Sequence, residues 1–501
     1  MGNTENFSQF RRQSKKGILV IYLNILYKVL KAFWVLLFLF IQKFSKISDE
    51  VLLYIYLGVG GLLLFFLVRA FLIFKNFKFK IENQHFILKK GIIKKTNTSI
   101  PFDRIQNINF KQNIIQQIIN VHEVNLETAG SSKAEISIKA LSFKEASALK
   151  QAITIFNNNV TESEIDTKVV EKPLLKVDFL ALMKVSITEN HLQSLLLLFA
   201  ILVGFYQQID ELVKGLGKRE QLKDFISNNT SALETSVILI IGLLISLTVV
   251  AVLSSVVRVV LRHFNLTVFV KNSALEIYQG LTTKKSVILK KDKVQHITIS
   301  HNPIKKWLGI SFITFKQAIS GKVKKKQDKI IKIVGCNKEQ VTAIKTLLFP
   351  GEILEGINKN YSHSYFKYRM YVRSVFFFVA LNIGLYFVVE NNYVFLVNII
   401  LVLLFIFIIE LKFRKRYYLF NEELLLVGQG IVETHKTFLP FFKVQNIELK
   451  QTIFQVRKNV ADLVFQTASG KIKLPCIPLE KAQKIYNYTL FKVETSKKSW
   501  M

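Results

Sequence analysis

The sequence predicts a multi-pass α-helical membrane protein with about six transmembrane helices in three hairpins, carrying three small β-rich domains that each end in a closing helix. Two observations predict this fold class. Six apolar runs approach or reach the length that crosses a bilayer. The pattern Gly, fourteen residues, then Gln-(Asn/His)-Ile follows each pair of runs. A pattern that recurs in this way indicates one module present in three copies.

The apolar runs come first in each repeat. The first contains Lys28 and Lys31, so its N-terminal part is expected to lie in the membrane interface. Basic residues are concentrated at the N-terminus and at the domain-side ends of the runs, which places the N-terminus in the cytoplasm. An even number of crossings between modules then puts all three modules on that side. The runs are residues 24–44, 51–74, 191–209, 235–258, 373–389 and 392–410.

Each module begins with alternating residues that predict short antiparallel strands, such as LTVFVKNSALEIYQ in the second copy. Fourteen residues after the signature glutamine stands Asn120, Gly309 or Asn459, and these residue types tolerate a left-handed backbone. Two further strands and an amphipathic helical segment complete each copy. A closing helix of this kind covers one open end of a small sheet.

These elements predict a division of the chain into alternating membrane and domain segments. The segments are a basic cytoplasmic N-terminus (1–23), hairpin 1 (24–75), domain 1 (76–155), a linker or interfacial segment (156–190), hairpin 2 (191–262), domain 2 (263–350), a linker (351–370), hairpin 3 (371–411), domain 3 (412–492) and a tail (493–501).

The six signature positions are interpreted as structural. The glycines are expected in a hairpin or bulge, because glycine accepts backbone conformations that other residues avoid. The glutamines are expected to bond to the backbone at a strand edge. The positions are Gly91, Gln106, Gly280, Gln295, Gly430 and Gln445.

Catalytic and metal-binding motifs are missing from the sequence. The chain has no phosphate-binding glycine loop, no nucleophile elbow and no paired histidine spacing. Cys336 and Cys476 lack a CxxC context and are expected to be small buried apolar residues. We therefore expect a protein that is not an enzyme and has no cofactor, metal or catalytic residue. A transporter or channel is one alternative and an undetected membrane enzyme is another. Against transport, the runs have no acidic residue near their centres.

The net charge of +34 favours an anionic partner, although a general compositional bias towards lysine explains part of it. Domain 2 is the most basic, with 17 lysines and four acidic residues between positions 263 and 350. Lysine without arginine favours diffuse attraction to a lipid surface over recognition of one headgroup. A solvated, composition-biased turn is the competing interpretation. Nucleic acid is not expected as a partner. The candidate surface contacts are Lys284, Lys285, Lys290, Lys291, Lys293, Lys322, Lys324, Lys325, Lys326 and Lys329.

The segments IPFDRIQNI (100–108) and LPFFKVQNI (439–447), each after a predicted hairpin, carry a family resemblance. The arrangement resembles the bacterial pleckstrin-homology-like (PH-like) membrane-flanked domain proteins, the YdbS/YdbT-like family, and its longer three-module member in particular. The second copy departs from the pattern at Lys290 and His296. The resemblance implies PH-like domains with a capping helix, the inner membrane of a bacterial cell and a role in envelope protection. It also implies a shorter one-module relative as partner.

The function expected from these features is a membrane-anchored scaffold. Its three cytoplasmic PH-like modules would bind a protein partner, an anionic lipid surface, or both. The residues do not determine the oligomeric state, and they leave the lipid specificity open.

Overall fold

The computed structural model of the protein describes residues 7–43, 48–128, 136–158, 173–189, 195–196, 198, 200, 233–271, 274–317, 331–350, 356–388 and 394–498. The chain forms two compact units. The first comprises Met1–Leu174, Thr267–Lys291 and Ile319–Lys326, and the second comprises Leu175–Leu266, Asp292–Ala318 and Gln327–Met501. The boundary between the units therefore passes through the second module.

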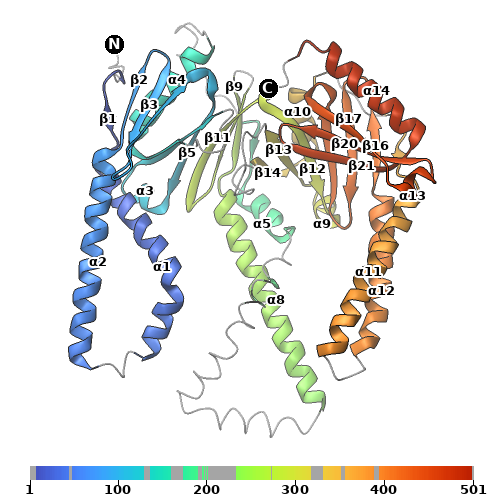
Figure 1. Cartoon of the computed structure of the whole chain (residues 1–501), viewed down its shortest axis with the longest axis horizontal. Coiled ribbons are helices and arrows are strands. Elements are labelled where there is room, and N and C mark those ends of the chain that lie inside the picture. The colour runs from blue at the N-terminus through green and yellow to red at the C-terminus, as the bar shows by residue number, and fades with distance from the viewer. Residues whose placement is uncertain are drawn as a thin grey trace. The chain divides into compact units, whose positions relative to one another are not determined.

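Long helices precede each module (Figure 1). They are α1 (Gly17–Lys43) and α2 (Asp49–Asn76) in the first unit, and α8 (Leu233–His263), α11 (Tyr365–Val388) and α12 (Val394–Arg414) in the second. In the described part of the chain, two helices rather than the predicted six are long and apolar enough to cross a membrane, Asp49–Asn76 and Ile245–His263.

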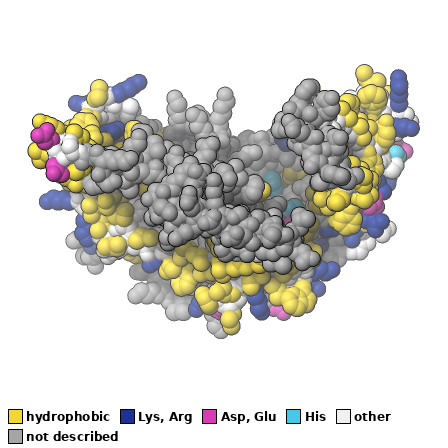
Figure 2. Space-filling model, turned by 90° about the horizontal axis from the view of Figure 1, so that it is seen from below, with side chains coloured by type: hydrophobic (Ala, Val, Ile, Leu, Met, Phe, Trp, Pro, Cys, Tyr) yellow, Lys and Arg dark blue, Asp and Glu magenta, His cyan; other side chains and the backbone are white. Residues whose placement is uncertain are grey.

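The difference from six has identifiable causes. Lysines interrupt α1, and α11 starts eight residues before the predicted run, within a stretch that carries Lys367, Arg369 and Arg373. Most of the run 191–209 lies outside the described residues. The side chains of α12 are described only from Asn398 onwards. Seen from the side of the helices, hydrophobic side chains form much of the described surface (Figure 2).

The first module is built from two half-sheets. One has the order β1 (Arg11–Arg12), β2 (Lys78–Glu82), β3 (His85–Lys90) and β4 (Thr96–Pro101). The other contains β5 (Ile105–Asn113), β6 (His122–Thr128) and β7 (Ile136–Leu141). The single turn η2 (Phe102–Arg104) connects β4 to β5.

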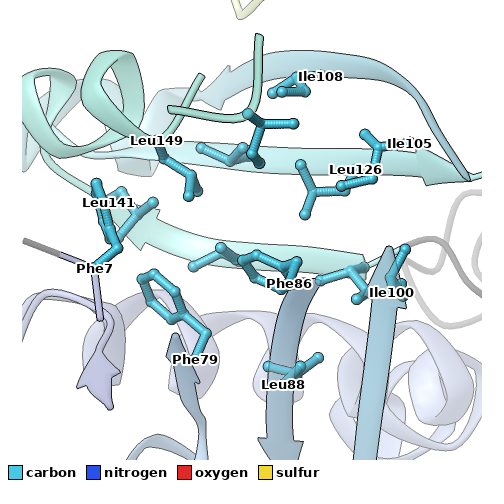
Figure 3. Packing of buried hydrophobic residues seen from close by; sticks show 14 of the residues in the cluster. Phe7, Phe79, Phe86, Leu88, Ile100, Ile105, Ile108, Leu126, Leu141 and Leu149 are labelled. Atoms are coloured by element: carbon cyan, nitrogen blue, oxygen red, sulfur yellow. The ribbon is translucent and has the colours of Figure 1, made fainter. Parts of the chain in front are cut away.

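Side chains of the two half-sheets pack against each other in a common core (Figure 3). Phe79, Phe86 and Leu88 come from the first half-sheet, and Ile108 and Leu126 come from the second. The alternation of buried and exposed residues along β2 and β3 produces this arrangement, because successive strand residues point to opposite faces.

The closing helix of the first module is α4 (Phe143–Asn158), whose Leu149 enters the same core. A capping box starts this helix: Ser142 Oγ accepts from the Glu145 amide, and the Glu145 carboxylate accepts from the Ser142 amide. The third module ends in α14 (Leu479–Thr495), which contributes Ala482 and Ile485 to its core. The predicted closing helices of these two modules are thus confirmed.

The half-sheets do not stay within their modules. In the first unit β5 pairs antiparallel with β11 (Thr283–Lys290), so β7-β6-β5 continues into β11, β10 (Ala274–Gln279) and β9 (Thr267–Lys271). We call this β5–β11 contact the first joint. It unites the second half-sheet of module 1 with the first half-sheet of module 2.

The second unit repeats this connection one module later. The strand β12 (Val294–His301), which follows the turn η4 (Lys291–Lys293), pairs antiparallel with β18 (Thr434–Pro440). We call this contact the second joint. The sheet order is β14 (Ile331–Cys336), β13 (Ser311–Gln317), β12, β18, β17 (Leu424–Gly430), β16 (Tyr417–Phe420) and β15 (Asn360–Tyr361).

The last half-sheet contains β19 (Val444–Lys450), β20 (Val460–Thr467) and β21 (Gly470–Pro478) and forms a three-stranded sheet by itself. It follows the turn η5 (Phe441–Lys443). The second unit also contains β8 (Leu175–Lys176), α5 (Phe179–Ile187) and α10 (Lys338–Leu348). Asn120, Gly309 and Asn459 have φ of 53°, 68° and 50°, which confirms the left-handed backbone predicted there.

Candidate anion-binding cavity

The signature glutamine occupies the same irregularity in all three modules. The strand pairing shifts register between Ile105 and Asn107, between Val294 and His296, and between Val444 and Asn446. The residue skipped by each shift is Gln106, Gln295 or Gln445. A bulge bends its strand and increases the local twist. The repeat signature thus marks the start of the strand that either forms a joint, as in β5 and β12, or lies at a sheet edge, as in β19.

The signature glycines lie where the backbone turns between two strands, with φ of 112° at Gly91, 105° at Gly280 and 145° at Gly430. A Cβ atom at Gly91 would lie 2.0 Å from the Lys94 carbonyl oxygen, and one at Gly430 would lie 2.1 Å from that of Glu433. These contacts are with backbone, so no side-chain movement could relieve them. The turn needs glycine for its conformation and its space.

The predicted lysine cluster is divided by the structure. Lys284, Lys285 and Lys290 belong to β11, and Lys291 and Lys293 belong to η4. Lys285 stands directly opposite Lys111 in the first joint, so part of this cluster takes part in sheet pairing. The five lysines at 322, 324, 325, 326 and 329 lie outside the described residues.

A different set of basic residues surrounds a cavity of about 710 Å³ in the second unit. The cavity lies where the second-joint sheet and β20–β21 meet the domain-side ends of α11 and α12. Seven of its lining side chains are cationic and one is a carboxylate, that of Asp462. The cationic residues are Lys316, Arg369, Arg373, Lys412, Arg416, Lys471 and Lys473.

The carboxylate is largely occupied by bonds within the protein. Asp462 Oδ2 accepts from Arg369 Nη1 at 2.7 Å, and Asp462 Oδ1 accepts from Gln455 Nε2 at 2.7 Å and from the Cys476 amide at 2.8 Å. Its single charge therefore offsets one of the seven cationic charges. The other six cations leave a strong positive potential in the cavity, since low-dielectric walls concentrate the field.

Two arginines are held in place by an aromatic ring as well as by polar groups. The guanidinium carbon of Arg416 lies 5.0 Å from the centre of the Phe366 ring, and that of Arg369 lies 5.8 Å from it. Arg416 Nη2 also approaches Gln429 Oε1 at 3.5 Å. The buried Nε atoms of both arginines have no hydrogen-bond partner among the described residues. A planar guanidinium group can bind a carboxylate or a phosphate through two parallel N–H···O bonds.

Histidines and hydroxyls supply the polar wall formed by the joined sheet. Thr298 and Thr437 face each other across the second joint, with 3.1 Å between their hydroxyl oxygens. Burial, together with the nearby Lys316 charge, lowers the pKa of His296 to about 4, and burial lowers the pKa of His435. Both imidazoles are therefore neutral at pH 7 and can donate or accept one hydrogen bond without adding charge.

Sequence reasoning did not identify this cavity. The basic residues at the domain-side ends of the apolar runs include Arg369, Arg373 and Arg416, but their places along the chain do not show that they meet Lys471 and Lys473. The useful signal is alternation: in a strand, residues two apart share a face. That rule places Lys471 and Lys473 on one side of β21, but it does not tell which helices lie opposite.

Metal and redox chemistry find no support among the described residues. These contain no group of three or more histidine, cysteine, aspartate or glutamate side chains that could hold a metal ion. Cys336 and Cys476 are free and buried, as predicted. Burial raises the pKa of Cys336 to about 12 and that of Cys476 to about 11, so neither thiol is a reactive thiolate at neutral pH.

The three copies also share an apolar exposed tip that the sequence reasoning missed. A short helix follows β5, β12 and β19 in turn: α3 (Ile114–Ile118), α9 (Pro303–Trp307) and α13 (Ile453–Val456). Each exposes large apolar side chains, with Trp307 83% exposed. The others are Ile114, Ile118, Ile304, Ile453, Phe454 and Val456.

Comparison with known proteins agrees with the threefold repeat. A family model described as Bacterial PH domain matches residues 28–154, 226–350 and 375–490, which together cover most of the chain. The chain is 25% identical over 301 residues to the UPF0699 transmembrane protein YdbT of Bacillus subtilis (strain 168). This match covers 58% of the chain and 56% of the relative, so it spans little more than half the relative's length. Three matches to one family model, aligned with three structural copies, show that the chain belongs to the bacterial PH domain family.

Proposed function

We propose that the protein is a non-enzymatic, membrane-anchored scaffold that binds anionic phospholipid headgroups at the cytoplasmic surface of a bacterial inner membrane. Two apolar helices and a relative named as a transmembrane protein support membrane association. The finer topology, six crossings with all three modules in the cytoplasm, rests on the distribution of basic residues.

The cavity is the observation that carries the lipid proposal. It holds seven cations against one carboxylate, and it lies beside the domain-side ends of a helical hairpin. A phosphate group at a bilayer surface could reach such a place without leaving the headgroup layer. Each basic residue near an anionic leaflet contributes about 1 kcal/mol of attraction. The cavity also contains arginines, whose guanidinium groups can bind a phosphate through two N–H bonds, and the lysine cluster predicted in module 2 has none.

The exposed apolar tips supply a second support. Ile118 on α3, Trp307 on α9 and Phe454 on α13 are all exposed, although large apolar side chains at three equivalent turns are costly in water. Aromatic and aliphatic residues flanked by lysines are typical of segments that lie in a membrane interface. The tips would hold each module against the lipid surface while the cavity binds a headgroup.

The polar residues within hairpin 3 favour helix packing over transport. Asn398 Nδ2 donates to Asn382 Oδ1 at 2.5 Å, and Asn382 Nδ2 donates to the Phe378 carbonyl. Both amides are thus used between and within α11 and α12. A partner protein, including a one-module relative, stays a prediction that the sequence resemblance alone supports.

Lipid binding is tested with the full chain purified in mild detergent. Short-chain phosphatidylglycerol is titrated and followed by native mass spectrometry, with phosphatidylcholine and free glycerol phosphate as separate arms. The triple variant Arg373→Gln, Lys471→Gln, Lys473→Gln should bind phosphatidylglycerol at least ten-fold more weakly. The charge-matched control Lys144→Gln, Lys484→Gln, Lys497→Gln, which alters residues outside the cavity lining, should bind like the parent.

The arms separate the possible results. Equal affinity of the triple variant and the control would refute the cavity as the lipid site. Binding of glycerol phosphate as tightly as phosphatidylglycerol would indicate a soluble phosphate ligand instead of a lipid.

A further inference from the structure

The two joints use the same register. In the first joint Lys284 pairs with Gln112, and Lys285 pairs with Lys111. In the second joint the equivalent residues, counted from the signature glycines, are Thr434 with His301 and His435 with Ser300, and these are the pairs observed. The registers agree although none of the four residues in these pairs is the same in the two joints, so the backbone geometry of the module determines the pairing.

Each joint is formed by two strand edges, and one edge of each kind occurs once more, at one end of the repeat, without a partner strand among the described residues. β4 is the counterpart of β11 and β18, and it pairs with β3 alone within the described residues. β19 is the counterpart of β5 and β12, and in the described structure it pairs with β20 alone. We propose that β19 of one chain pairs antiparallel with β4 of a second copy, which forms a third joint between chains.

Four other sheet edges, those of β2, β16, β7 and β21, accept contacts from segments of the same chain. The short strand β1 covers β2, and β15 covers β16. At the opposite edges, the Ser14 amide donates to the Ala140 carbonyl beside β7, and the His363 amide donates to the Cys476 carbonyl of β21. The fold thus protects these outer edges with the segments that lead into the hairpins, whereas among the described residues no such segment pairs with β4 or β19.

The composition of β4 also favours pairing. Its six residues, Thr96–Pro101, include no charged side chain. Proteins usually protect an exposed edge strand from pairing with another chain by lysine, by inward charge or by a bulge. Within β4, only Pro101, its last residue, lacks an amide donor. The equivalent residue of β11, Lys290, lies outside the part of β11 that pairs in the first joint.

The shared register fixes the partners in the third joint. Thr96 would face Lys450, Asn97 would face Leu449, and Thr98 would face Glu448. In the first joint Gln117 Nε2 on α3 donates to the Thr282 carbonyl in the turn of the next module. The equivalent residues at the chain ends are Val456 and Ile93, both exposed, the latter by 99%. An apolar contact between them would take the place of that hydrogen bond.

Pairing of this kind is head-to-tail, since the two edges belong to opposite ends of the repeat. Heterologous contacts form a closed ring or an open filament, depending on the rotation between successive copies. Backbone hydrogen bonds would supply the attraction and the side-chain pairs would supply the register, as in other cases of strand addition to a sheet edge.

The experiment uses two differently tagged full-length chains co-expressed in bacterial membranes. One carries Thr98→Cys and the other carries Glu448→Cys, and a mild oxidant is added before the tags are detected. The native cysteines are buried and serve as the background in every sample. A disulfide that joins the two tags is expected. The matched control pairs Thr98→Cys with Glu480→Cys, an exposed position on α14 that is outside β19 and faces no residue of β4 in the proposed register, and should give at least ten-fold less product.

A charge exchange tests the register independently. Thr98→Glu places two carboxylates opposite each other and should weaken self-association at least ten-fold by mass photometry in detergent. Glu448→Lys on the other chain should restore association, which a merely unfolded variant could not do.

Three results would overturn the proposal. One is an absence of cross-linked product together with purely monomeric chains. A second is as much cross-linked product with Glu480→Cys as with Glu448→Cys. The third is cross-linking of Thr98→Cys only to a different protein, which would make β4 a docking edge for a foreign module.

Discussion

The two joints show one backbone arrangement stabilised by two different sets of side chains. In the first joint, Gln117 Nε2 donates to the Leu281 and Thr282 carbonyls at 3.0 and 3.2 Å, so this contact joins neutral groups. In the second joint, Lys305 Nζ lies 2.6 Å from Glu433 Oε1, and the Lys305 side chain is only 2% exposed.

The difference teaches that the repeat preserves register and leaves the chemistry of the joint free to vary. Lys305 also lies 3.7 Å above the Phe312 ring, so the second joint contains a buried cation that depends on its partners. Burial lowers the pKa of Lys305, and Glu433 opposes that shift. We therefore expect the second joint to respond more strongly than the first to loss of charge and to acid.

The largest effect is expected from the turn that leads into β18. Gly430→Ala forces a Cβ atom against the Glu433 carbonyl at a φ of 145°, and it should cost about 3 kcal/mol or more of stability. The measurement is hydrogen exchange of the β17–β18 segment in the detergent-purified chain. Gly309→Asn is the control, because a Cβ atom at this position would meet no other atom within 4 Å and asparagine occupies the equivalent position in the other two modules. Equal protection in both variants would contradict the steric argument.

The second-largest loss of stability is expected when acid protonates groups of the second joint. His296 is neutral in the folded chain because burial lowers its pKa from 6.5 to about 4. The unfolded chain therefore binds more protons between these values, so this stability is present above pH 6.5 and is lost as the pH falls towards 4. The loss should be on the order of 2–3 kcal/mol.

This acid effect is measured as hydrogen exchange of β12 at pH 7 and at pH 5, after correction for the intrinsic exchange rate. Burial also lowers the pKa of His301 in the same joint, which adds in the same direction. His296→Asn places the residue that modules 1 and 3 have at this position and should remove most of the pH dependence. An unchanged pH profile in that variant would show that another group is responsible.

A smaller effect is expected from the joint's ion pair. Glu433→Ala leaves the buried Lys305 ammonium without its nearest carboxylate and should cost about 2 kcal/mol, less than a fully buried pair because Glu433 is partly exposed. The equivalent change in the first joint, Thr283→Ala, should alter stability by less than about 0.5 kcal/mol. Thermal unfolding of the two variants under identical conditions compares them, and equal losses would mean that the joints do not differ in this way.

Much of the module could be predicted from the sequence because its signals are local. Asn120, Gly309 and Asn459 indicated left-handed positions, and the helical periodicity of 142–153 and 478–491 indicated closing helices. The bulge at the signature glutamine was not foreseen, because a bulge depends on the partner strand and not on the bulged residue. Among the described residues, two of the six predicted membrane helices are long and apolar enough to cross a membrane.

The sequence by itself determined that one β-rich module occurs three times, each copy preceded by apolar helices, because residue periodicity and turn residues act over a few positions. Only the tertiary structure decided that neighbouring modules share sheets, and that the ends of α11 and α12 meet β21 around a basic cavity. Strand edges and helix ends from distant parts of the chain meet through backbone hydrogen bonds and packing. Such contacts leave little trace in the order of residues, since the same register forms with Lys285 opposite Lys111 and with His435 opposite Ser300.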